Sequence, residues 1–176
     1  MSRKQFLIVV DMQKDFVDGA LGTPEAAAIV PAVAEKIRGW DGDIIVTYDT
    51  HPDSYLQTQE GRRLPVEHCI HGTPGWQLDA QVQDALEGRD FYALLKGTFG
   101  SDQLPELVAE IAGEEPFTVT FIGLCTDICV VSNALLLKAF FPEVPMSVDA
   151  KCCAGVTPAK HEAALETLRS CQFDVI

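Results

Sequence analysis

The sequence has 176 residues, enough for one domain with a full hydrophobic core and too few for two domains of ordinary size. Its apolar content of 47% and charged content of 22% are typical of a soluble globular protein. The net charge of −13 argues against nucleic acid or an anionic membrane as the main partner, because phosphate binding needs clustered lysine and arginine. No apolar segment reaches the length of a membrane span. We therefore expect a single domain over residues 1–176.

Strand and helix patterns alternate along the chain. The apolar run 6–10 is too short for the core of a secretory signal, so it predicts a first strand in a cytoplasmic protein. Further strands are predicted at 43–48, 91–95, 117–122, 145–149 and 173–176, and helices at 24–38, 104–111, 130–141 and 158–170. Solid apolar strands that alternate with helices are typical of a parallel sheet covered on both faces. The sequence thus predicts an α/β fold of three layers, α/β/α, around a six-stranded parallel sheet.

Cys129 lies just after the predicted strand 117–122. Thr126 and Asp127 are side chains that favour a helix start, so Cys129 is expected in the first turn of the helix that follows. Free backbone N–H groups and the helix dipole at such a position favour a thiolate, as a nucleophilic cysteine requires. The alternative is a small buried apolar residue, the commoner state of a free cysteine.

Two further polar residues lie at strand ends. Asp11 follows the first predicted strand and Lys96 follows the third. Because the carboxyl ends of parallel strands meet at one edge of a sheet, both are expected near Cys129. Taken singly, Asp11 can be a solvated carboxylate or helix cap, and Lys96 a surface cation. Together, an acid, a lysine and a thiol at one edge indicate an activated nucleophile.

Asp49, His51 and His68 form a second candidate cluster. Asp49 ends the second predicted strand, and a long irregular segment of about residues 50–75 contains both histidines. Two imidazoles and one carboxylate make a ligand set suited to zinc or another transition metal. A loop histidine is more often a hydrogen-bonding surface group, and His71 is a candidate for that role.

Five segments of the chain together form a specific pattern: Phe6-Leu-Ile-Val-Val-Asp-Met-Gln-Lys-Asp-Phe16, Asp49-Thr-His-Pro52, His68-Cys69, Lys96-Gly-Thr-Phe-Gly-Ser101 and Gly123-Leu-Cys-Thr-Asp-Ile-Cys-Val130. In these segments the chain resembles the isochorismatase-like cysteine hydrolases over nearly its whole length, and among them it is most similar to the nicotinamidases. The resemblance implies an isochorismatase-like, Rossmann-like fold. It also implies hydrolysis of a small amide, with nicotinamide and NAD salvage as the expected context, by a homo-oligomer.

The resemblance also implies roles for particular residues. Asp11, Lys96 and Cys129 match the catalytic triad, and Asp49, His51 and His68 match the ligands of a divalent metal, zinc first and manganese or iron next. The backbone N–H groups of Cys125 and Cys129 match the oxyanion hole, with a cis peptide before Cys125. Phe16 matches the aromatic residue that lies against the substrate ring.

One departure affects the substrate pocket. Nicotinamidases commonly have an aromatic residue shortly before the last metal histidine, but this sequence has Leu64 there, with one extra residue before His68. The loop after Lys96 is also shorter than in many nicotinamidases. Leu64 is therefore a candidate substrate-binding residue that leaves two enzymatic functions open: a nicotinamidase, or a hydrolase of another small amide or carbamoyl compound. A non-catalytic small-molecule binding protein is the alternative from another class.

Overall fold

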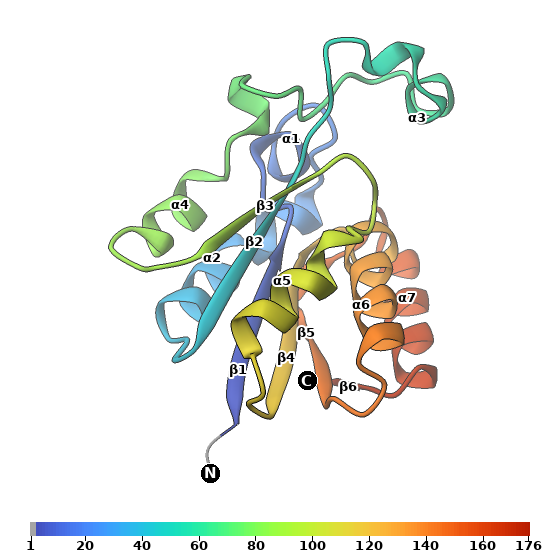
Figure 1. Ribbon diagram of the computed structural model, residues 1–176. Helices are drawn as coiled ribbons and strands as arrows, with labels where there is room; N and C mark the ends of the chain where they lie inside the picture. Colours follow the sequence, from blue (N-terminus) through green and yellow to red (C-terminus); the bar gives the residue numbers. More distant parts are fainter. Residues whose placement is uncertain (1–2) are drawn as a thin grey trace.

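The computed structural model describes residues 3–176 and contains one six-stranded parallel sheet (Figure 1). The strand order is β3-β2-β1-β4-β5-β6, and each neighbouring pair is parallel. The strands are β1 (Lys4–Val10), β2 (Asp43–Asp49), β3 (Tyr92–Lys96), β4 (Phe117–Leu124), β5 (Met146–Ala154) and β6 (Phe173–Val175). The predicted fold class is confirmed. The order of the strands reverses between β1 and β4, where open sheets of this type bind ligands.

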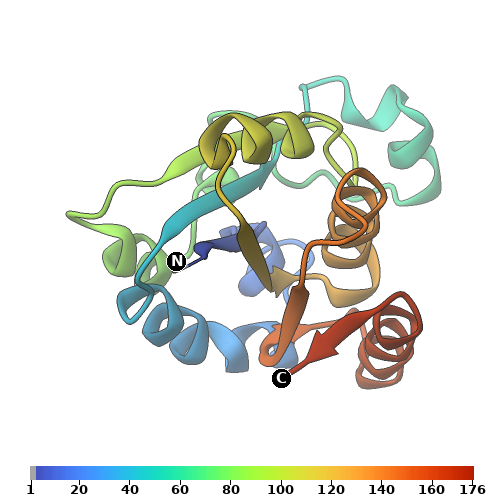
Figure 2. The same ribbon diagram turned by 60° about the horizontal axis from the view of Figure 1, so that its bottom comes forward.

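The helices cover both faces of the sheet. They are α1 (Lys14–Val17), α2 (Pro24–Arg38), α3 (Gln59–Arg63), α4 (Ala80–Leu86), α5 (Gln103–Ala112), α6 (Val131–Phe140) and α7 (Pro158–Ser170). Helices α2 and α4 pack on one face, and α5, α6 and α7 pack on the other. Figure 2 shows α2 and α5 on opposite sides of the sheet. Within residues 3–176, no helix combines the length and apolar character needed to cross a membrane.

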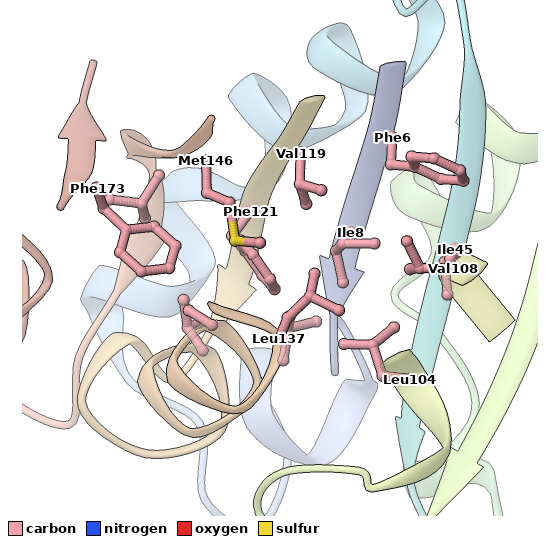
Figure 3. Close-up of a cluster of buried hydrophobic side chains, with 14 of the residues drawn as sticks. Phe6, Ile8, Ile45, Leu104, Val108, Val119, Phe121, Leu137, Met146 and Phe173 are labelled. Carbon is pink, nitrogen blue, oxygen red and sulfur yellow. The ribbon is translucent and has the colours of Figure 1, made fainter. Parts of the chain in front are cut away.

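Alternate side chains of the central strands build two hydrophobic cores. Phe6 and Ile8 of β1 pack with Leu104 of α5 and Leu137 of α6 (Figure 3). Leu7 and Val9, on the opposite face of β1, pack against α2 and α4. Because both faces of β1 are buried, its sequence is a continuous apolar run rather than an alternating one.

Local side-chain signals place the two longest helices at the residues that the sequence predicts. Thr23 caps α2 by accepting a hydrogen bond from the Ala26 N–H, and Gly39 ends that helix. Thr157 caps α7 in the same way through the Lys160 N–H. A proline occupies the first turn of each helix, where no intrahelical N–H donor is needed.

Several local predictions are wrong in detail. Strand β5 runs to Ala154, well beyond its predicted end at residue 149. Strand β4 does not stop before Gly123 but continues to Leu124. Gly123 adopts a φ of +116°, and a Cβ there would lie 2.1 Å from the Val10 carbonyl oxygen, so glycine permits close pairing with β1. Residues 14–17 and 80–86, for which the sequence predicts no helix, form α1 and α4.

Candidate active site

The four predicted polar residues at strand ends converge at one edge of the sheet. Asp11 follows β1, Asp49 and Lys96 are paired in register at the ends of β2 and β3, and Cys129 follows β4. All four are buried, with no more than 5% of any residue exposed. The edge therefore combines two carboxylates, an amine and a thiol away from bulk water.

Lys96 contacts both other members of the predicted triad. Its Nζ lies 2.6 Å from Asp11 Oδ2 and 3.4 Å from Cys129 Sγ. The same amine donates a hydrogen bond to the Thr98 carbonyl oxygen at 3.2 Å and lies 3.5 Å from Asp49 Oδ1. The Thr47 hydroxyl donates to Asp11 Oδ1 at 2.6 Å and so fixes the orientation of that carboxylate. The structure thus brings together the acid, the lysine and the cysteine.

Burial sets the protonation of this cluster. It raises the pKa of the Cys129 thiol well above its usual range; the negative charge of Asp11 acts in the same direction, and Lys96 opposes it. Burial also raises the pKa of Asp11, in spite of the opposing charge of Lys96. Burial by itself would lower the pKa of Lys96, but Asp11, Cys129 and Asp49 raise it above its ordinary value. Lys96 thus favours the thiolate, as expected, but burial opposes it, so formation of the thiolate requires a proton acceptor.

The segment that carries Cys129 is a π-helical turn, Thr126–Val130, and α6 begins only at Val131. Neither Thr126 nor Asp127 caps a helix. The Thr126 hydroxyl is hydrogen-bonded to His161 Nδ1 at 2.8 Å, and Asp127 Oδ1 accepts from the Val156 N–H at 2.9 Å. Tertiary partners on the segment after β5 thus replace the predicted capping bonds. The peptide between Leu124 and Cys125 is cis, which confirms that expectation.

A second cluster lies beside the triad. One potential ligand atom from each of Asp49, His51 and His68 lies within 4.8 Å of the others, and all three residues are buried. Asp49 Oδ2 is 2.9 Å from His51 Nε2 and 3.6 Å from His68 Nε2. His68 Nδ1 lies 2.8 Å from the Val66 carbonyl oxygen, a backbone contact that orients the ring of a metal ligand. Two imidazoles and a carboxylate fit a divalent transition metal.

The charge on Asp49 suits this role. Burial alone would raise the pKa of Asp49, but hydrogen bonds from His51 and His68 and the charge of Lys96 lower it well below its ordinary value. Asp49 therefore stays a carboxylate, as a metal ligand must be.

Glu60, in α3, was not predicted from the sequence. Its Oε1 lies 3.7 Å from both His51 Nε2 and His68 Nε2, so it offers a second carboxylate to the same cluster. An acidic residue in a polar segment gives no signal by itself. Only the fold of residues 50–75 brings Glu60 to the imidazoles.

An open cleft of about 520 Å³ lies next to this cluster. His51, Glu60, Leu64 and Phe99 are among its lining residues. Leu64 is 39% exposed and Phe99 is 47% exposed, so both present apolar surface at the cleft. Phe99 was not singled out from the sequence. Phe16 is not among the lining residues, but its ring centroid lies 5.4 Å from that of His68, at the edge of the cluster.

Side chains of the segment after β1 hold the backbone of the metal-ligand cluster through hydrogen bonds. The fully buried Gln13 side chain donates to the carbonyl oxygens of Asp49 and Trp76 and accepts from the Asp49 N–H, all within 2.9 Å. Asp15 Oδ2 accepts from the Cys69 N–H at 2.8 Å, next to His68. Gln13, which precedes α1, and Asp15, within α1, thus fix the backbone at Asp49 and next to His68, two potential metal ligands.

A doubly covered parallel sheet with a buried acid, lysine and cysteine at its switch point defines an α/β cysteine hydrolase. The family model described as the isochorismatase domain matches residues 5–176. The chain belongs to the isochorismatase family.

Relatives of the chain agree with this assignment. A nicotinamidase from Schizosaccharomyces pombe is 27% identical over 218 residues, which cover 100% of this chain and 94% of that protein. A pyrazinamidase from Pyrococcus horikoshii, whose crystal structure is in complex with zinc, is 27% identical in sequence to this chain. The match covers 98% of each chain and has a TM-score of 0.77. A nicotinamidase structure from Bacillus subtilis, 24% identical with 98% of each chain covered, has a TM-score of 0.82 and matches the fold.

Proposed function

We propose that this protein is a nicotinamidase, which hydrolyses nicotinamide to nicotinic acid and ammonia through a thioester. The observation that carries the proposal is the position of Lys96 Nζ, 2.6 Å from Asp11 and 3.4 Å from the Cys129 sulfur in a buried site. The similarity to nicotinamidases over the full chain supports the choice of substrate.

In the proposed reaction Asp11 is the general base. It removes the proton from the Cys129 thiol, and its raised pKa makes it a better acceptor than an exposed carboxylate. The sulfur attacks the amide carbon, and Asp11 returns the proton to the leaving nitrogen, so that the C–N bond breaks and ammonia departs. Water, deprotonated by Asp11, then attacks the thioester, and the released sulfur regains the proton. Lys96 stays positively charged and stabilises the charges on Asp11 and the sulfur.

The oxyanion formed in each step needs hydrogen-bond donors. We assign this role to the backbone N–H groups of Cys125, which directly precedes the π-helical turn, and of Cys129, which lies within it. A donor of this type contributes roughly 3 kcal/mol to the transition state.

Asp49, His51 and His68, with Glu60 beside them, would hold the metal ion, for which zinc is our proposal. The zinc in the Pyrococcus horikoshii structure supports this choice. When bound, the ion supplies a Lewis acid that orients the substrate, through the ring nitrogen of nicotinamide. Phe16 would lie against the substrate ring, and Leu64 and Phe99 would form the outer wall.

Metal removal is the first prediction. Dialysis against a chelator should release about one equivalent of metal, and nicotinamide hydrolysis should fall because the substrate is no longer oriented. The His68→Ala variant should bind zinc at least about 100-fold more weakly in a chromophoric chelator competition. The His71→Ala variant is the matched control, since His71 lies outside the three-residue cluster, and it should bind zinc normally. Equal zinc affinity of His68→Ala and the unaltered protein would rule out the site.

The substrate is tested by ammonia release from a panel of small amides. Nicotinamide should give the highest kcat/KM, followed by pyrazinamide, an aromatic amide of similar shape. Leu64 supports one alternative, hydrolysis of another small amide or carbamoyl compound, because it replaces an aromatic surface with an aliphatic one. A kcat/KM for an aliphatic amide or a ureido compound above that for nicotinamide would favour this alternative.

A further inference from the structure

Asn133 is a buried polar residue that the reaction proposed above does not use. It lies on α6, four residues after Cys129, and none of its surface is exposed. Its side-chain Nδ2 donates to the Cys129 carbonyl oxygen at 2.8 Å and to the Phe99 carbonyl oxygen at 3.1 Å. Its Oδ1 accepts from the Ser101 N–H at 2.9 Å. Both amide hydrogens and the oxygen are therefore hydrogen-bonded.

Two of these partners belong to the segment 97–101, which joins β3 to α5. That segment contains two groups that matter to the site. The Thr98 carbonyl oxygen accepts a hydrogen bond from the Lys96 amine, and the Phe99 side chain lines the cleft. The remaining partner is the backbone of Cys129 itself. One amide thus connects the nucleophile to the segment that holds its neighbouring lysine.

The packing of Gly100 shows how closely the segment approaches α6. A Cβ built on Gly100 would lie 3.2 Å from the backbone carbon and oxygen of Ser132, tighter than an ordinary contact. Residues 97, 98 and 99 are exposed, and the Thr98 hydroxyl bonds only to the Gly100 carbonyl oxygen within the segment itself. The hydrogen bonds to Asn133 are therefore the main polar attachment of this exposed segment to α6.

We propose that Asn133 is a positioning residue that fixes the segment 97–101, and with it Lys96 and the Phe99 wall of the cleft, relative to Cys129. The expected change in kcat/KM rests on the proposed amidase function, whereas the expected loosening of the segment 97–101 does not. Without the amide, the segment separates from α6, the Thr98 carbonyl no longer constrains the lysine, and the wall of the cleft moves.

Two substitutions separate the contacts. Asn133→Thr has a side chain of similar size whose hydroxyl can bond back to the carbonyl of Cys129, four residues earlier, but cannot bridge to Phe99 and Ser101. Asn133→Ala removes all three bonds. The matched control is Ser147→Ala, which removes a partly buried hydroxyl that bonds Thr120 and the Val119 carbonyl in the sheet.

The experiment measures hydrogen–deuterium exchange and steady-state kinetics on the same samples. In both Asn133 variants, peptides that cover residues 97–103 should exchange about tenfold faster or more, because the Ser101 N–H loses its acceptor. Their kcat/KM for nicotinamide should fall about tenfold or more, since small displacements of reacting groups are costly. Ser147→Ala should match the unaltered protein in both measurements.

Unchanged exchange at 97–103 in Asn133→Thr would overturn the inference, as would a kcat/KM within twofold of the unaltered protein. If Asn133→Ala does not fold, Asn133→Thr decides. If the unaltered protein releases no ammonia from any amide, the proposed function fails, and the exchange measurement alone decides whether Asn133 holds the segment.

Discussion

The Cys129→Ala variant should fold normally and lose amidase turnover by roughly 10⁴-fold or more, because no other group can form the thioester. Alanine removes a single buried sulfur atom from the core cluster, so the variant should lose only about 1 kcal/mol of stability. The measurement is ammonia release from nicotinamide at saturating substrate, alongside thermal unfolding.

The control for this experiment is Cys152→Ala. Cys152 is also buried, but it packs in the core on the α2 side of the sheet. This variant should keep its activity, which shows that loss of a buried thiol is not enough to abolish turnover. Substantial ammonia release by Cys129→Ala would reject covalent catalysis at this residue.

The Lys96→Met variant should lose both stability and amidase activity. It leaves Asp11 as a buried carboxylate without its cation, next to a second carboxylate at Asp49. Removal of one partner from a buried ion pair costs about 3–5 kcal/mol. Urea unfolding should show this loss, and nicotinamide hydrolysis should fall about 10³-fold or more.

A double variant separates stability from chemistry. Asp11→Asn combined with Lys96→Met removes both charges and should recover most of the free energy of unfolding. It should remain inactive, because it lacks the proton acceptor. Lys96→Met with normal stability, or a double variant less stable than Lys96→Met, would show that the ion pair does not hold the site together.

The strands and the positions of the triad could be predicted from the sequence because both depend on local patterns. Buried parallel strands are solid apolar runs, and a polar residue directly after such a run lies at the edge where ligands bind. Asp11, Asp49 and Lys96 are therefore predicted to lie together, although they are far apart in sequence.

The features that were missed depend on contacts between distant segments. Thr126 predicts a helix start because threonine commonly caps helices, but its hydroxyl is bonded to His161 on α7. Gly123 predicts a strand end, yet the close approach of Val10 requires a residue without a Cβ inside the strand. Glu60, on the short helix α3, and Phe99, in the segment after β3, reach the site only through the tertiary fold.

The two oxygens of Asp49 face different partners: Oδ2 lies toward the imidazoles and Oδ1 toward the amine of Lys96. The Asp49 carboxylate therefore belongs both to the proposed metal site and to the group of charges around Cys129. Loss of either histidine leaves that anion in place beside the amine, whereas a change at residue 49 disturbs both neighbours at once. A metal ion bound at the proposed site would therefore alter the surroundings of the sulfur through this one side chain.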